Sequence, residues 1–518
     1  MNIIDRFVAW RDPVRGLQRA QARRALAYYE GAKRSRQRKH RNDNSSPNAL
    51  VGSGAAALRA HARYLERNHD LSRGALRVLV NNVVGASGIG IEPQPRRRDG
   101  TIHKEYASAL REAHRDWQRH PEVTKKYRWP MAQRLMGYTW LRDGEAFAQE
   151  LIGPVPYLNH GTRVPYSLEL FEPDFVPLDY DDVSKGIRQG IQSNAWGEAT
   201  GYLVHKGDPR DAMTIRGLSD LKTVPAERML HLATLDRLHQ SRGVSEFGSV
   251  ITRVEDLKDL EESERIAAKV AASLTAYVKR DDKAGFDGAG PQPEVDAEGN
   301  LMPRDLRMQP GMIIDSLQVG EEIGVIDSNR PNPNLVAWRA GQLRAFAAGI
   351  GASYSSISRD YNGTYSAQRQ ELVEQWVHYA VLTDEFVGMF VQPSWETFVR
   401  VAHLSGAVPI PADVEPGTED DALFVGQSMP WINPVHEAAA WEKLVQAGFA
   451  SEVEVIRRRG GNPRDVLEQV DAFRKEAAEK ALVFSSDAAT KAGVGFGTAA
   501  APASRRKQDE EEDEEATA

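Results

Sequence analysis

The chain has 518 residues, of which 41% are hydrophobic, so it is large enough for a sizeable core and for more than one structural unit. It contains no cysteine, which excludes disulfides, thiolate metal sites and cysteine nucleophiles. Its longest apolar stretches, such as Phe386 to Val391, are far shorter than the ~20 residues of a membrane-spanning helix, and Met1 to Pro13 carries charges that do not suit a secretory signal.

The net charge of −7 conceals opposite charges at the two ends of the chain. Ten basic residues and one acid lie between Arg15 and Arg41, whereas Asp509 to Glu515 is an unbroken run of seven acids. The basic segment is either an exposed helix face followed by a loop, or a contact for DNA phosphates or an acidic assembly partner. We expect the acidic end to be a disordered, solubilising tail.

The front of the chain predicts a mixture of helices and strands. Apolar spacing predicts a helix over about Ala55 to Val80, and the glycine-broken run from Val83 to Ile91 predicts a tight turn leading into a strand. Further helices are expected over His103 to Gln118 and Trp129 to Asp143. From there to about Leu232, alternating segments separated by Asn, Gly, Pro and Asp predict an antiparallel β region.

A long helix is predicted after Gly243, because apolar residues recur every three or four positions up to Val278, which gives a rod of about 50 Å. Its acidic side chains form a solvated face or, alternatively, a pore wall that would include Glu255, Asp259 and Glu262. A polar insertion follows at Asp281 to Met302, with short strands at Met312 to Leu317 and Glu322 to Asp327.

Two more helices are expected downstream, over Leu335 to Ile350 and Tyr365 to Met389, with a loop at Ala352 to Gly363 between them. Long helices flanking a β-rich excursion fit poorly into one compact monomer, so we expect packing against copies of the same chain. The last ordered unit is predicted to be helical, and disorder is expected beyond Ser485. Its helices cover Pro434 to Ala447, Ser451 to Gly460 and Pro463 to Leu482.

Motifs that would carry covalent chemistry are missing. The sequence has no Gly-Lys-Ser or Gly-Lys-Thr phosphate loop, and Ala440 stands where a helical zinc signature beginning at His436 would need its second histidine. Acid pairs such as Glu172 with Asp174 lie among turn residues, where carboxylates usually cap and solubilise loops. We therefore expect no enzyme activity, no cofactor and no metal.

Several ordered blocks give the chain a resemblance to the portal proteins of lambda-like tailed phages, from about Ala55 to Ala478. The most specific block runs from Phe346 to Arg369 and is similar to the family's Ala-Gly-x-Gly, Asp-Tyr and Tyr-Ser-Ser-x-Arg sequence, with Ala367 replacing the second serine. The other blocks are Arg73 to Gly90 with Asn81 to Gly85 at its centre, Arg142 to Phe147, the positions Ile187, Gly190-Ile191, Gly197 and Tyr202, then Val224 to Ala226 with His231, Gln240 to Val244, Pro310-Gly311 with Gly320 to Glu322, and Asn433-Pro434 with Gly448.

The resemblance implies an α+β portal fold with a mixed wing, long stem helices, a small β-containing clip and a helical crown, assembled into a closed ring of about twelve subunits. It divides the chain into a basic arm (1–54), wing (55–244), first stem helix (245–280), clip (281–334), second stem helix (335–351), tunnel loop (352–363), wing with a long helix (364–430), crown (431–485) and acidic tail (486–518).

The resemblance also implies a portal vertex subunit of the virion, assembled in the host cytoplasm, through which DNA is packaged and ejected. Its expected partners are double-stranded DNA, the terminase large subunit, head-tail connector proteins, and the major capsid and scaffolding proteins, with no membrane. Another ring-forming head-tail adaptor and a nucleic-acid-processing enzyme are the alternatives. The tunnel-loop residues expected at the DNA channel are Ser353, Tyr354, Ser355, Ser356, Ser358, Arg359 and Asp360, and the stem wall would present Glu255, Asp259 and Glu262.

Overall fold

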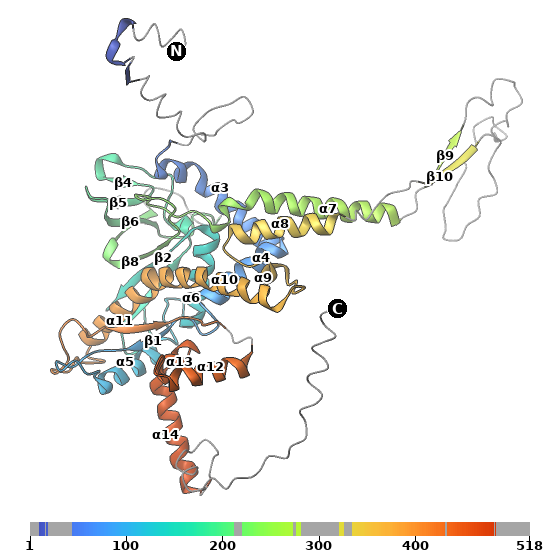
Figure 1. The fold of residues 1–518 in the computed structure, drawn as a ribbon. Coiled ribbons are helices and arrows are strands. Elements are labelled where there is room, and N and C mark those ends of the chain that lie inside the picture. The colour runs from blue at the N-terminus through green and yellow to red at the C-terminus, as the bar shows by residue number, and fades with distance from the viewer. Residues whose placement is uncertain are drawn as a thin grey trace, which may run out of the picture.

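The computed structural model describes residues 10–15, 17–18, 44–211, 220–272, 276–280, 321–325, 334–429, 433–480 and 482. Helices and strands are mixed along the chain, and the sheets are open (Figure 1). The predicted insertion at Asp281 to Met302, the strand at Met312 to Leu317 and the acidic tail lie outside the described residues, as does most of the basic arm.

The front of the chain is mainly helical. The single helix predicted over Ala55 to Val80 is wrong, because α3 (Pro47–Asn68) and α4 (Asp70–Val83) are separated at His69. His69 has an extended backbone, and its Nδ1 atom accepts a hydrogen bond from the Ser72 amide, which caps α4. Strand β1 (Gly90–Pro93) and helices α5 (Lys104–Trp117) and α6 (Trp129–Asp143) confirm the next three predictions.

Two antiparallel sheets make up the predicted β region. Strands β2 (Glu145–Ile152), β3 (Tyr166–Phe171) and β8 (Met229–Ala233) form one sheet in the order β3-β2-β8. The second sheet has the order β4-β5-β6-β7 and includes β4 (Ile187–Arg188), β5 (Ile191–Ser193), β6 (Ala199–His205) and β7 (Leu221–Pro225). Short 3-10 helices lie at Pro173–Phe175, Val183–Lys185 and Ala226–Arg228.

Two helices, α7 (Ile251–Ala272) and α8 (Leu335–Gly349), project from the body as a pair, and this pair is called the stem below (Figure 1). A 3-10 helix at Glu246–Ser249 precedes α7. The helix predicted to continue to Val278 is too long, because β9 (Ala276–Arg280) pairs with β10 (Glu321–Val325). Tyr277 and Val278 are residue types that favour strands, and the antiparallel partner supplies the backbone hydrogen bonds that a helix would otherwise make.

A nearly continuous helical rod follows the stem. After α9 (Tyr354–Ser358), α10 (Tyr365–Phe386) passes through a π-helical turn at Val387–Val391 into α11 (Gln392–Leu404). Pro393 accounts for this turn, because proline cannot donate to the carbonyl of Met389 and its ring would clash there in a regular α-helix. The long helix predicted to end at Met389 therefore continues to Leu404.

The C-terminal part agrees with the helical prediction. Helices α12 (Pro434–Gln446), α13 (Glu452–Arg458) and α14 (Pro463–Glu479) follow β11 (Ala422–Val425), which pairs with β1. Arg457 donates to the buried carboxylate of Glu92 at 3.1 Å, and this contact ties the C-terminal helices to the front of the chain.

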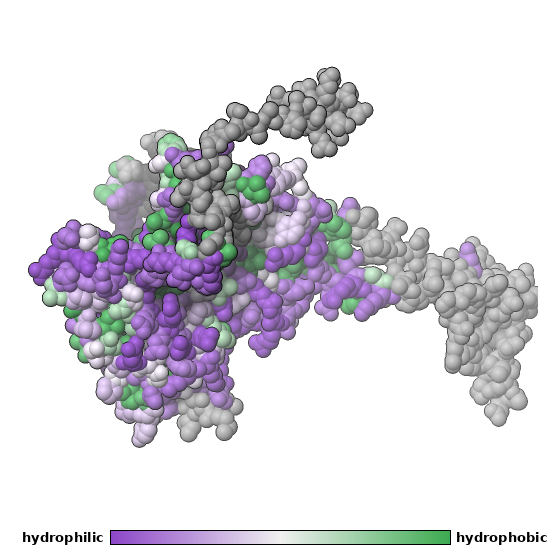
Figure 2. All heavy atoms as spheres, turned by 90° about the horizontal axis from the view of Figure 1, so that it is seen from below, coloured by the Kyte–Doolittle hydropathy of each residue, from purple (hydrophilic) through white to green (hydrophobic). Residues whose placement is uncertain are grey.

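The face seen from below is mainly hydrophilic, with separate apolar patches (Figure 2).

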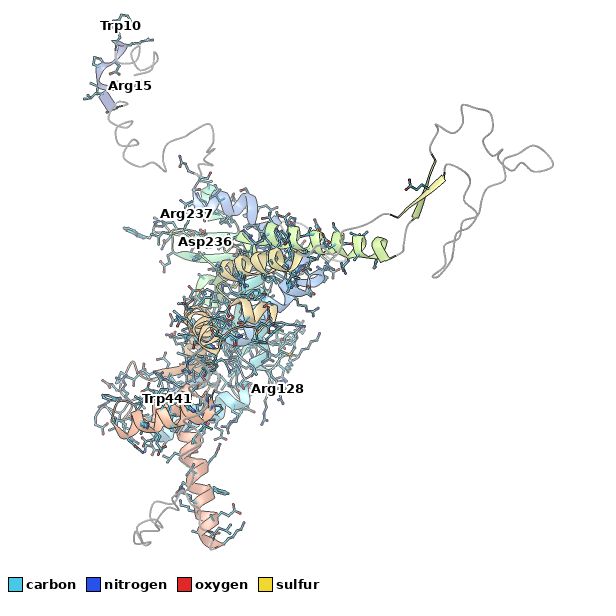
Figure 3. All side chains as sticks on the ribbon, turned by 45° about the vertical axis from the view of Figure 1, so that its right-hand side comes forward. Trp10, Arg15, Arg128, Asp236, Arg237 and Trp441 are labelled. Atoms are coloured by element: carbon cyan, nitrogen blue, oxygen red, sulfur yellow. The ribbon has the colours of Figure 1, made fainter. Side chains whose placement is uncertain are left out.

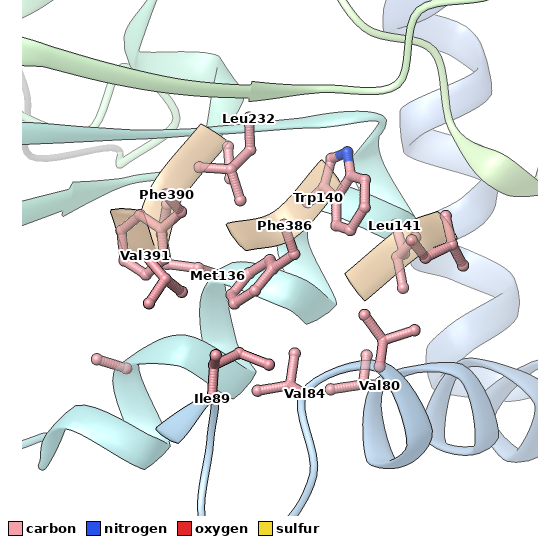
Figure 4. Packing of buried hydrophobic residues seen from close by; sticks show 14 of the residues in the cluster. Val80, Val84, Ile89, Met136, Trp140, Leu141, Leu232, Phe386, Phe390 and Val391 are labelled. Carbon is pink, nitrogen blue, oxygen red and sulfur yellow. The ribbon is translucent and has the colours of Figure 1, made fainter. Parts of the chain in front are cut away.

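One large aromatic and aliphatic core joins α4, α6, β8 and the π-helical turn (Figure 4). Trp140, Phe386 and Phe390 are fully buried in it, and neighbouring aromatic rings lie in tilted contacts. His114 is enclosed by Trp117 and Phe398, and this burial lowers its pKa to about 3, so the imidazole is neutral. The same buried cluster includes Val254 of α7 and Phe346 of α8, so it joins the two stem helices to the body.

Candidate functional site

The two stem helices are held together near the body by apolar packing and further out by polar contacts. Val254 and Leu257 of α7 and Leu343 of α8 are buried, and the rings of Phe247 and Phe346 lie 6.4 Å apart. Further along, Arg339 Nε lies 2.5 Å from Glu261 Oε1. The stem therefore leaves the body as a paired unit.

The acidic side chains expected at a channel wall lie along one stripe of α7. Glu255 is partly buried and faces α3, since its carboxylate lies 3.9 Å from His61 Nδ1. Asp259 and Glu262 are exposed further along the helix. The stripe thus begins against the same chain's α3 and continues into solvent.

The predicted tunnel loop contains a short helix, so the expectation of an irregular loop over Ala352 to Gly363 is wrong. Ser353 is the N-cap of α9, because its hydroxyl accepts from the Ser356 amide. Arg359 ends α9 in the left-handed conformation, with φ 57°. A hydroxyl-rich sequence of this kind favours caps and turns, and here it forms a single capped turn.

Side-chain hydrogen bonds fasten α9 to α10. Ser355 Oγ donates to Glu371 Oε2 at 2.7 Å, and Gln375 Oε1 accepts from both the Ser353 amide and the Ser356 hydroxyl at 3.0 Å. Ser353 and Ser355 are each only 5% exposed. Their hydroxyls therefore face the protein interior in the single chain, and their predicted position at the DNA channel remains a prediction.

The exposed part of the loop begins at Arg359. Its Nη1 atom lies 3.5 Å from the Tyr361 hydroxyl, and the Tyr361 side chain is 59% exposed. Asp360 accepts a hydrogen bond from Tyr354 at 3.2 Å, while the Arg344 guanidinium lies over the Tyr354 ring. Ser358, also predicted at the channel, donates a hydrogen bond to the Tyr354 carbonyl within α9.

A buried charge network lies where the stem joins the body, and sequence reasoning did not identify its members as a site. Arg242 and Glu145 are both fully buried, with Arg242 Nη2 2.7 Å from Glu145 Oε1. Arg59 Nη2 also contacts this carboxylate at 2.9 Å, and His231 Nε2 lies 3.3 Å away. Burial alone would raise the pKa of Glu145, but Arg242 and the hydrogen bond from His231 outweigh it and hold that pKa far below its usual value.

Arg242 also satisfies backbone groups of the segments around it. Its guanidinium donates to the carbonyls of Gln189 and Val176, at 2.5 and 3.1 Å. One side chain thus joins β2, the loop after β3 and the turn before β5 to the segment that begins the stem. The sequence signals were that Arg242 lies in the Gln240 to Val244 block and Glu145 in the Arg142 to Phe147 block, but the two residues are 97 positions apart and no local pattern pairs them.

Close backbone contact completes this junction. Gly144 has φ 91°, and a Cβ atom on it would lie 2.3 Å from the carbonyl carbon of Val244. A Cβ atom on Gly243 would lie 2.0 Å from the Gly144 carbonyl oxygen. Both positions therefore require glycine, and together with Arg242 they define the stem base.

Comparison with known proteins decides the family. The model of the phage portal protein, lambda family, matches residues 33–382, which include the stem base, both stem helices and α9. The chain belongs to the lambda family of phage portal proteins. As a portal chain it is a virion component and a subunit of the portal vertex, and its family is structural rather than catalytic.

Curated relatives agree with this assignment. The chain is 23% identical over 425 residues to the probable portal protein of Halomonas phage phiHAP-1, covering 80% of this chain and 79% of that one. It is also 23% identical to portal protein B of Escherichia phage lambda, and the match covers 79% of this chain and 82% of the lambda protein.

Among solved structures, a chain from the virion of a native gene transfer agent particle is similar to this one with a TM-score of 0.39 and 12% identity. That match covers 81% of this chain and 95% of the other chain.

The described part of the chain offers neither a metal-binding cluster nor a membrane-spanning helix. No group of three or more His, Cys, Asp and Glu side chains is arranged there to hold a metal ion. In the same part of the chain, every helix is too short or too polar to cross a bilayer.

Proposed function

We propose that copies of this portal chain close into a ring of about twelve subunits around a channel for double-stranded DNA. In this arrangement α7 and α8 surround the channel, and α9 with the following residues forms the tunnel loop. The family match carries the proposal, because it spans both stem helices and the tunnel-loop segment. DNA would enter the capsid through the ring during packaging and leave through it during ejection.

An exposed apolar stripe on α10 supports ring closure. Val373, Val377 and Val381 follow one another at four-residue spacing and are 45%, 65% and 52% exposed. Such side chains favour burial by about 25 cal/mol for each Å² removed from water. A neighbouring subunit packed along α10 would cover this stripe.

The tunnel loop has few charges for holding DNA. Arg359 is the only cation among residues 352–363, and it is exposed at the end of α9. Strong phosphate contacts repeated around a ring would slow the sliding of the duplex, since each releases counterions on binding. We propose that Arg359 and Tyr361 lie nearest the DNA, while the serines of α9 hold the loop to α10.

The remaining partner assignments follow the division of the chain. We propose that residues 281–334 form the clip, which meets the terminase large subunit during packaging and head-tail connector proteins afterwards. The wing would contact the major capsid and scaffolding proteins, and assembly would take place in the host cytoplasm. Neither catalysis nor a cofactor is needed for this role.

Ring formation is tested by native mass spectrometry and electron microscopy of the purified full chain. We expect a closed oligomer of about twelve subunits with a central channel and a mushroom-like side view. A stable monomer at micromolar concentration would contradict the proposal.

The role of Arg359 is tested with Arg359→Glu in assembled heads. We expect a change in packaged DNA length or in DNA retention, because a like charge would face the phosphates. Arg188→Glu is the matched control, since Arg188 is also exposed but lies in the β4 sheet. An unchanged packaged length for Arg359→Glu would rule out the channel contact.

A further inference from the structure

The N-terminal arm carries a short helix with exposed apolar side chains. Residues 13–15 and 17–18 are helical, and Asp12 Oδ1 caps this helix by accepting from the Val14 and Arg15 amides at 3.1 Å. Val14 and Leu17, three positions apart and therefore on one face, are 65% and 61% exposed. Trp10, just before the cap, is 81% exposed.

A groove of about 580 Å³ lies beside the β4-β5-β6-β7 sheet. The buried side chains of Ile187 and Ile191 line it, and three exposed apolar side chains are among its remaining lining residues. These are Val183, Trp196 and Leu235, which are 94%, 92% and 54% exposed. Apolar side chains gathered around one groove are typical of a docking surface.

The arm joins the body at this groove. Asn48, in the first turn of α3, lines the groove, donates to the His239 carbonyl at 2.9 Å and accepts from the Ser241 amide at 2.8 Å. Figure 3 shows Asp236 and Arg237, which follow Leu235, on the body, with Trp10 and Arg15 standing apart from it.

Only residues 19–43 separate the helix from the body, and 25 residues can span up to about 80 Å when extended. The connection is therefore long enough to fold back. A tether of this length also keeps the helix at an effective concentration on the order of millimolar near the groove.

We propose that the helix bearing Val14 and Leu17 docks in the groove of its own subunit. Its apolar face would then lie against Val183, Trp196 and Leu235, and both sets of exposed side chains would leave water together. The inference does not depend on ring formation or DNA passage.

Cross-linking tests this docking directly, because the chain has no cysteine of its own. Val14→Cys is combined with Val183→Cys in the full-length oligomer and treated with a short bis-maleimide. We expect a link within one chain, seen as a cross-linked peptide pair without a chain-dimer band in denaturing gels. Val14→Cys with Val435→Cys is the control pair, since Val435 is 76% exposed on α12, away from this sheet (Figure 1).

Protection of the groove gives a second measurement that does not depend on cross-linker geometry. With Val183→Cys alone, we expect maleimide labelling to become several-fold faster when Val14→Asp and Leu17→Asp are added. Arg15→Glu, on another face of the same helix, should leave the labelling rate unchanged. Links only between chains, links equal to those of the control pair, or labelling unaffected by the aspartates would each overturn the proposal.

Discussion

The stem base and the proposed tunnel loop, residues 352–363, both contain many polar side chains, but those side chains are buried in the first and partly exposed in the second. At the stem base, Arg242 and Glu145 are fully buried and joined by several hydrogen bonds. In the tunnel loop, only the side of α9 that faces α10 is fastened, and the residues from Arg359 onward are largely exposed. A substitution should therefore cost folding free energy at the first place and change local motion or contacts at the second.

The largest expected effect comes from Arg242→Met. It leaves the Glu145 carboxylate buried beside Arg59 but without its main partner, and removing one member of a buried pair costs about 3–5 kcal/mol. Denaturant unfolding with circular dichroism measures this cost. Arg359→Met, at an exposed position, should change stability by less than about 0.5 kcal/mol, and equal effects for the two variants would refute the contrast.

Gly144→Ala should be nearly as damaging. The new Cβ would meet the Val244 carbonyl carbon at 2.3 Å in addition to the cost of φ 91°, so we expect a loss of about 3 kcal/mol or more. Gly153→Ala is the matched control, because Gly153 has φ 72° but no atom within 4 Å of an added Cβ. Its loss should be limited to about 1–2 kcal/mol for the left-handed backbone. Similar melting temperatures would count against close packing at Gly144.

The 3-10 helix that leads from the stem base into α7 should respond to pH through its first residue, Glu246. Burial, with smaller contributions from the Asp236 and Glu385 charges, raises its pKa to about 7. Because the folded protein holds this proton more tightly than the unfolded chain, its stabilisation is complete below about pH 4.5 and is lost as pH rises to about 7. Between about pH 4.5 and 7, the free energy of unfolding should therefore fall by on the order of 2 kcal/mol less in Glu246→Gln than in the unchanged protein. Unfolding free energy measured against pH tests this difference. An identical pH profile for the two proteins would contradict the assignment.

Ser355→Ala should destabilise the protein less than the changes at the stem base. It removes the hydrogen bond to Glu371, which contributes about 1 kcal/mol, and should speed amide hydrogen exchange in 353–360 without changing exchange at the stem base. Ser358→Ala provides the comparison, since its hydroxyl bonds only within α9 and the turn that follows. Global unfolding of Ser355→Ala would show that the loop and the core are not separable.

Sequence patterns predicted elements whose stability comes from local periodicity. The helix over Trp129–Asp143 was placed correctly, and the second stem helix was placed to within one residue of its end. Apolar spacing could not reveal the end of α7 at Ala272, because the strand that follows depends on a partner some 45 residues later. A helix end decided by such a pairing leaves no local signal.

The candidate site was less accessible from sequence. The serines of α9 were correctly located in the loop, but their attachment to Glu371 and Gln375 depends on how α9 folds against α10. Arg242 likewise appeared only as part of a recognised block, and its role became clear when Glu145 and the carbonyls around it were brought together. Buried polar networks join distant residues, so single-sequence patterns rarely predict them.

The π-helical turn made by Pro393 has a mechanical consequence. It lets α10 and α11 run on as a single rod of about 60 Å, from the segment beside the tunnel loop to the helix packed against α5. Phe386 and Phe390, at the middle of that rod, are clamped in the core. Because α11 is buried in the core as well, at Trp395, Phe398 and Ala402, a force on the exposed start of α10 would be transmitted into the body of the protein.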